Sequence, residues 1–183
     1  MYKILTALLS LTTLAACSAK LSLPPYQPTT SSEINAAVEV NNFSYFPREG
    51  VAQNEIRETA AGHVYLTEDV GTYFANAVRR EMRQANMSIQ SKNCTLDGEV
   101  NDFATDSLGY SVDYITDVRY ILRRTKDQKT LFDNNYTVKF NASKFVVADV
   151  FFANINKMVS DNIDQLLKDS VFVTTTKENC AKN

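Results

Sequence analysis

A regular alternation of apolar and charged residues runs through positions 112–123. The apolar set is Val112, Tyr114, Val118, Tyr120 and Leu122, and the charged set between them is Asp113, Asp117, Arg119 and Arg123. Because successive side chains of a strand point to opposite faces, this period of two predicts a β-strand with one buried face. Ile115 and Ile121 interrupt the charged set, so we expect part of the second face to be covered as well.

Segments on either side of this strand have the same period. Apolar residues alternate with polar ones at Leu96, Gly98 and Val100 before it, and at Phe132, Tyr136, Val138 and Phe140 after it. The connections at 107–109 and 125–129 are short enough for an antiparallel meander. A first strand is expected at 36–45, followed by a long loop at 48–62 and a short extended piece at 63–66.

Two other segments have a helical period. Between Thr67 and Asn86 one face carries Val70, Phe74, Ala77, Val78, Met82 and Ala85, and between Val147 and Lys168 apolar residues recur every four positions at Phe151, Ile155, Val159, Ile163 and Leu167. Thr67 is the expected N-cap of the first helix, with Glu68 and Asp69 in its first turn and Asn86 just beyond its end. The order β-α-β-β-β-α predicts an α+β two-layer sandwich, with an antiparallel sheet of about four strands and two helices on one face.

The N-terminus has the pattern of a secretory signal. Lys3 precedes an apolar run at 4–11, and small residues follow it. The run is too short to span a bilayer, which needs about 20 residues. Residues 18–33 then contain three of the four prolines and no apolar period. We therefore predict a signal peptide at 1–16, a flexible tether at 17–35 and one globular domain at 36–183.

The residues Leu14-Ala15-Ala16-Cys17 resemble the bacterial lipobox. The resemblance implies cleavage before Cys17 and attachment of diacylglycerol and palmitate to that cysteine, and the alternative is an ordinary cut after Ala-x-Ala. Several acyl chains hold a protein on a membrane, whereas one gives only marginal binding. Ser18 is similar to the residue that follows the cysteine in outer-membrane lipoproteins. This implies the periplasmic face of the outer membrane, with the inner membrane as the less favoured alternative.

Cys94 and Cys180 form an even pair once Cys17 is assigned to lipid. The periplasm is oxidising, so we predict a disulfide between them that ties the start of a central strand to the C-terminal tail. The alternative is two free thiols.

Packing motifs in the domain resemble those of YajG-type lipoproteins. They are Val70-x-x-Tyr73-x-x-x-Ala77-x-x-x-Glu81-Met82-x-x-Ala85-Asn86, Leu96-Asp97-Gly98-Glu99-Val100 and Leu166-Leu167-Lys168-Asp169-Ser170-Val171-Phe172. More loosely, the chain is similar to the LPS-assembly lipoprotein LptE and to auxiliary lipoproteins of ABC-type lipid transporters. The resemblance spans about 36–173 and implies fold more than function; Asn86 stands where such families often have glycine.

Signatures of catalysis are missing from the sequence. His63 has no Cys or His at ligand spacing, the five glycines form no phosphate-binding loop, and the net charge of −2 is spread along the chain without a basic stripe. Glu68 with Asp69 is interpreted as a helix start, and Glu99 and Asp102 fall on opposite faces if their strand is unbroken. We expect no enzymatic activity, no cofactor, no metal site and no binding of nucleic acid.

The candidates for contact with a partner are Arg79, Arg80, Arg83, Tyr73 and Phe152. The arginines, with Arg48 and Arg57 upstream, are suited to an anionic group such as a lipid A phosphate; the alternative is a solvated helix end. Tyr73 and Phe152 lie beside the predicted inner faces of the two helices. The expected function is a non-enzymatic accessory or binding component of cell-envelope assembly or transport, with an envelope protein as partner. The alternative is a module that binds lipid, LPS or a small apolar ligand.

Overall fold

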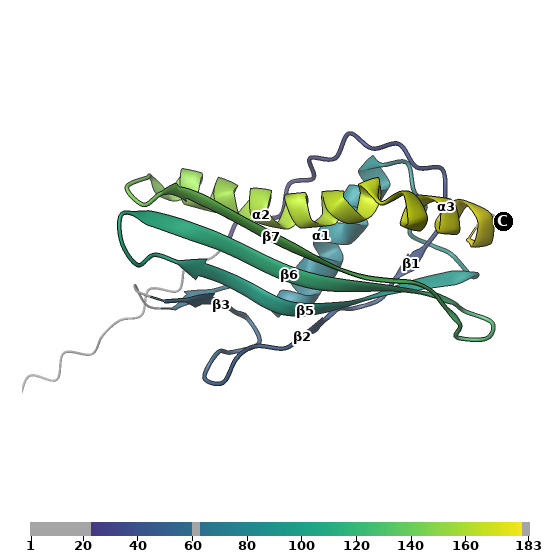
Figure 1. Cartoon of the computed structure of the whole chain (residues 1–183), viewed down its shortest axis with the longest axis horizontal. Helices are drawn as coiled ribbons and strands as arrows, with labels where there is room; N and C mark the ends of the chain where they lie inside the picture. Colours follow the sequence, from purple (N-terminus) through teal and green to yellow (C-terminus); the bar gives the residue numbers. More distant parts are fainter. Residues whose placement is uncertain (1–22, 60–62, 181–183) are drawn as a thin grey trace, which may run out of the picture.

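The computed structural model describes residues 23–59 and 63–180. A twisted sheet forms one layer, and helices cover one of its faces (Figure 1). The main path of the sheet has the order β4-β3-β5-β6-β7, with β1 and β2 also paired to β5. The α+β class and the placement of helices agree with the prediction, but the sheet is mixed.

The predicted meander is confirmed as three long strands, β5 (Cys94–Asp106), β6 (Ser111–Arg124) and β7 (Thr130–Ser143). They pair antiparallel along their length. The apolar set of the central strand is buried as expected, since Tyr114, Val118 and Tyr120 are 0% exposed. On the opposite face, charged side chains pair across strands, as Arg123 does with Asp97.

The prediction of four antiparallel strands is wrong for the other edge of the sheet. There β1 (Glu39–Val40), β2 (Ser44–Tyr45) and β3 (Glu55–Glu58) all pair parallel with β5, and β4 (Val64–Tyr65) pairs antiparallel with β3. The expected strand at 36–45 is thus interrupted, and the expected loop at 48–62 contributes a strand. These pieces are two to four residues long, and strands this short do not carry a recognisable period.

Helix α1 (Val70–Gln84) begins three residues later than Thr67. Asp69 occupies the N-cap position, where its side chain accepts no capping hydrogen bond, and Glu68 precedes the helix. Asn86 has φ 60°, which confirms it as the residue just beyond the C-cap. The apolar face of α1 packs on the sheet, and Phe74, Val78 and Met82 are 0% exposed.

Helix α2 (Ala148–Lys168) confirms the second predicted helix, and α3 (Ser170–Asn179) follows it after one residue. The third helix was not predicted because its apolar face is narrow: Phe172 and Thr176 are its buried residues. Asp169 separates the two helices and caps α3, accepting hydrogen bonds from the backbone N–H of Val171 (2.7 Å) and Phe172 (3.1 Å).

Asp169 also accepts a hydrogen bond from the hydroxyl of Tyr136 on β7 (2.6 Å). Burial raises the pKa of Asp169, but hydrogen bonds, led by that from Tyr136, outweigh burial and lower this pKa below its ordinary value. A carboxylate whose pKa is lowered by folding stabilises the protein above its unfolded pKa of about 4, and this contribution is lost as pH falls through the folded pKa.

We therefore expect Asp169→Ala to lower the free energy of unfolding by about 1 kcal/mol near neutral pH. The difference from the wild type should shrink as pH falls from about 4, where the unfolded chain becomes protonated, through the lower pKa of the folded wild type. Urea unfolding at several pH values measures it. Asp149→Ala removes an exposed carboxylate from the first turn of α2 and is the matched control. A deficit of the same size at every pH would contradict the role given to the carboxylate.

The predicted disulfide between Cys94 and Cys180 is present, with Cα atoms 5.5 Å apart. It joins the start of β5 to the residue that caps the end of α3. Cys17, the lipobox and the signal segment lie outside the described residues.

Residues 23–35, predicted to be part of a flexible tether, pack against the domain. The exposed fractions of Tyr26 and Ile34 are 3% and 2%, and the backbone N–H of Ile34 donates to the carbonyl of Ala85 (2.7 Å). The prediction failed here because isolated apolar residues in a polar, Pro-rich stretch have no period. The tether assignment is therefore wrong for this part of 17–35.

Candidate functional site

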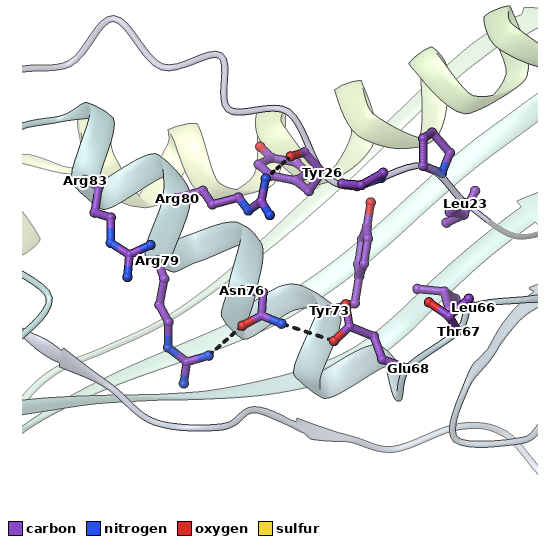
Figure 2. Close-up of a pocket in the computed structure, with 12 residues that line it drawn as sticks. Leu23, Tyr26, Leu66, Thr67, Glu68, Tyr73, Asn76, Arg79, Arg80 and Arg83 are labelled. Carbon is purple, nitrogen blue, oxygen red and sulfur yellow. Dashed lines mark hydrogen bonds between the residues drawn. The ribbon is translucent and has the colours of Figure 1, made fainter.

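Arg79, Arg80 and Arg83 project from one side of α1 (Figure 2). Their side chains border a cavity of about 390 Å³. The other walls come from the segment 23–26, from residues 66–68 and from Tyr73 and Asn76 of the same helix. The helical spacing of three and four residues places the arginines along one side of this cavity. The structure thus brings together four of the five predicted contact residues.

Arg79 is held by neutral groups. Its guanidinium donates to the side-chain oxygen of Asn76 (3.0 Å) and to the backbone carbonyls of Val40 (2.8 Å) and Asn41 (3.2 Å). Asn76 in turn donates to the carboxylate of Glu68 (3.1 Å), as Figure 2 shows. Glu68 is the acidic residue of the cavity lining, and it reaches Arg79 only through this amide.

Arg80 and Arg83 are exposed. Arg80 donates to the backbone carbonyl of Tyr26 (3.0 Å). Within residues 23–59 and 63–180, no carboxylate oxygen lies within 4.0 Å of any of the three guanidinium groups. Arg119 on the far face of the sheet contrasts with them, because it pairs with both Glu99 (3.1 Å) and Asp133 (2.7 Å).

Glu81 fixes one wall of the cavity to α1. Its side chain is 1% exposed and accepts hydrogen bonds from the hydroxyl of Tyr26 and from the backbone N–H of Thr29 and Thr30 (2.9 Å each). A buried carboxylate is stable when several donors satisfy it. This wall was not predicted from the sequence. Two features could have indicated it: Tyr26 follows two prolines, and Glu81 stands among the apolar residues of the helix.

Tyr73 lies at the base of the cavity and is 6% exposed. Burial, with a further contribution from Glu68, raises the pKa of Tyr73 to about 12, although Arg80 acts in the opposite direction. The phenol is therefore neutral at physiological pH and available as a hydrogen-bond donor.

Phe152, the fifth predicted contact residue, borders a second cavity of about 350 Å³ together with Asp149 and Asn156 of α2. Pro24 and Pro25 line both cavities. The backbone N–H of Gln27 donates to Asn156 (2.8 Å), which holds the segment against α2. The incoming chain thus lies between the arginine cavity and the Phe152 cavity.

The remaining candidate residues form hydrogen bonds or ion pairs within the fold, away from the arginine cavity. His63 is hydrogen-bonded to Glu55, and Arg48 and Arg57 both pair with Asp102, so neither belongs to the arginine cavity. A β-bulge between Val100 and Asp102 breaks the regular alternation of β5. Glu99 and Asp102 were predicted to lie on opposite faces only if this strand were unbroken, so that prediction does not hold.

The described ranges contain neither a metal-binding cluster nor a membrane-spanning helix. No cluster of three or more His, Cys, Asp or Glu side chains there is arranged to hold a metal ion. None of the helices in those ranges combines the length and apolarity needed to cross a membrane.

Comparison with known proteins places the fold. No family model and no curated protein sequence matches the chain. Among solved structures, the protein XCC0632 from Xanthomonas campestris, assigned to the family DUF330, is similar with a TM-score of 0.68 and 12% identity, covering 86% of this chain and 98% of that one. The hypothetical protein CT253 from Chlamydia trachomatis has a TM-score of 0.52 and 7% identity, covering 76% and 97%. At such identities the likeness establishes a shared fold and nothing about the site.

Proposed function

We propose that the protein is a lipid-anchored, non-enzymatic accessory of the bacterial cell envelope that binds an anionic group of its partner at the arginine cavity. The observation that carries the proposal is the set of Arg79, Arg80 and Arg83, which border one cavity without a carboxylate partner in the described structure. Guanidinium groups with free donors bind phosphate and carboxylate oxygens. The resemblance of Leu14-Ala15-Ala16-Cys17 to a lipobox supports the lipid anchor, and Ser18 supports placement on the periplasmic face of the outer membrane.

Two features of the cavity suit it to binding. Arg79 and Glu81 are held by several hydrogen bonds each. The Arg79 guanidinium, and the segment that Glu81 binds, are therefore ordered before a ligand arrives. Arg80 and Arg83 remain exposed and can adjust to the ligand. Preorganisation of part of a site reduces the entropic cost of binding.

The alternative, a module that encloses an apolar ligand, has less support. The layer between the sheet and the helices is filled by large side chains that are 0% exposed, among them Phe74, Phe103, Tyr114 and Met158. The arginine cavity suits the anionic headgroup of a lipid or LPS, or an acidic surface of an envelope protein. It does not suit an acyl chain.

Charge reversal tests the proposal. In cells that lack the wild-type protein, Arg80→Glu/Arg83→Glu should reduce the yield of crosslinked partner, or of co-purified anionic lipid, at least tenfold, because two cations become anions at the cavity. The yield is measured after crosslinking in intact cells and gentle detergent extraction. Mass spectrometry of the same preparations reports whether Cys17 carries diacylglycerol.

Lys126→Glu/Lys177→Glu is the matched control, since it makes the same change in net charge at exposed positions outside the cavity. It should leave the yield unchanged. Equal yields from the two double variants would remove the arginine cavity from the function.

A further inference from the structure

Large apolar side chains are exposed at one end of the molecule. In the described residues, seven such side chains are exposed: four belong to the β5–β6 turn and the β7–α2 connection, and a fifth lies beside them in the first turn of α2. These five, here called the apolar tip, are Leu108 (68%), Tyr110 (90%), Phe145 (81%), Val147 (69%) and Val150 (43%). Figure 1 shows the two connections at the same end of the sheet, opposite to α3. Exposed apolar residues that gather in this way indicate a contact surface.

The apolar tip is built on braced turns. Lys144 donates to the carbonyl of Ser107 (2.6 Å), so the two connections are tied together. The backbone N–H (3.2 Å) and hydroxyl (2.6 Å) of Ser107 donate to Glu58 of β3. Gly109 has φ 95°, a conformation that other residues rarely adopt, and this fixes the path of the turn between Leu108 and Tyr110. The apolar side chains are therefore displayed by an ordered framework.

The incoming chain reaches the domain near this tip. Pro24 and Pro25 border a cavity with Asp149 and Phe152, which lie in the first turns of α2. Val147 directly precedes α2, and the rise from Val147 to Phe152 is about 7.5 Å at helical spacing. Leu23 is only six positions beyond Cys17, and six residues span at most about 20 Å. A lipid on Cys17 would hold this end of the domain close to the bilayer.

We infer that the apolar tip inserts into the interfacial region of the phospholipid bilayer to which the chain is anchored. The inference rests on the proposed lipid anchor. Tyrosine is favoured at this depth, because its ring enters the acyl boundary while its hydroxyl stays hydrated. Phenylalanine and leucine supply the apolar contact of interfacial segments. With its tip in the membrane, α2 and α3 lead away from the bilayer, and the domain has a fixed orientation instead of moving freely on a tether.

The chain contains no tryptophan, so single tryptophans report the position of each site. The full-length lipidated protein carrying Tyr110→Trp or Phe145→Trp is reconstituted in vesicles of phosphatidylethanolamine and phosphatidylglycerol, with and without brominated acyl chains. Val171→Trp is the matched control, since Val171 is also exposed (60%) but follows α2, a helix about 30 Å long. Circular dichroism checks that each variant is folded.

We expect brominated lipid to quench the tryptophan emission of the Tyr110→Trp and Phe145→Trp variants at least twofold and to leave the Val171→Trp variant unchanged. A lipid-bearing chain whose tip tryptophans are quenched no more than this control would overturn the inference and leave the anchor intact. A blue shift at the tip without quenching would indicate a protein contact and would also overturn it. A chain shown by mass spectrometry to lack lipid at Cys17 would remove the anchor and the inference together.

Discussion

Replacement of both Cys94 and Cys180 by serine is expected to lower the free energy of unfolding by about 3 to 5 kcal/mol. The disulfide closes a loop with a sequence separation of 86 residues, and the chain-entropy model assigns the largest effects to long loops. Domains of this size are stabilised by only about 5–15 kcal/mol. The double variant should therefore be close to unfolding at physiological temperature. Urea unfolding of the oxidised wild type and of Cys94→Ser/Cys180→Ser measures the difference.

The bridge also fixes how the C-terminus meets the sheet. Both cysteines are 0% exposed, and the carbonyl of Cys180 accepts a hydrogen bond from the backbone N–H of Ala37 (3.2 Å). Cys17→Ser is the control, because it removes the third cysteine and keeps both Cys94 and Cys180, and it should leave unfolding unchanged. If a reductant fails to lower the stability of the wild type, the bridge does not contribute as expected.

The parts of the fold that the sequence revealed are those with long uninterrupted patterns. Strands β5, β6 and β7 have 13 to 14 residues each, and α2 has 21, so their periods stand out from neighbouring residues. The parallel strands β1, β2 and β3 could not be predicted in this way. They are short, and their pairing with β5 depends on the return of the chain through α1, which is a tertiary effect.

The candidate site was predicted as separate residues, and the structure adds their arrangement. Helical spacing was sufficient to place Arg79, Arg80 and Arg83 on one side of α1, and Tyr73 beside them. Spacing does not show that the segment 23–30 returns to form a wall, because that depends on the burial of Tyr26 against Glu81. The same segment lies between Phe152 and the arginines, so that Phe152 borders a second cavity.

Two glycines allow α1 and β5 to close around Phe43, whose side chain is 6% exposed. A Cβ added at Gly71 would lie 2.1 Å from the backbone oxygen of Phe43, and a Cβ added at Gly98 would lie 2.1 Å from its ring. Both distances are far below van der Waals contact, so alanine at either position forces the structure to move. The obstacles differ, because a ring can be removed by mutation and a backbone carbonyl cannot.

We expect Gly71→Ala to lower the free energy of unfolding by about 3 kcal/mol, although alanine is the better helix former by about 1 kcal/mol. Thr72→Ala, at the next position of α1, is the control and should change stability by no more than about 0.5 kcal/mol. Gly98→Ala should be similarly harmful in the wild type. In a Phe43→Ala background its additional cost should fall below about 1 kcal/mol, since the ring is gone, whereas the cost of Gly71→Ala should persist. Equal relief of both substitutions by Phe43→Ala would show that the two clashes have a common origin in the ring.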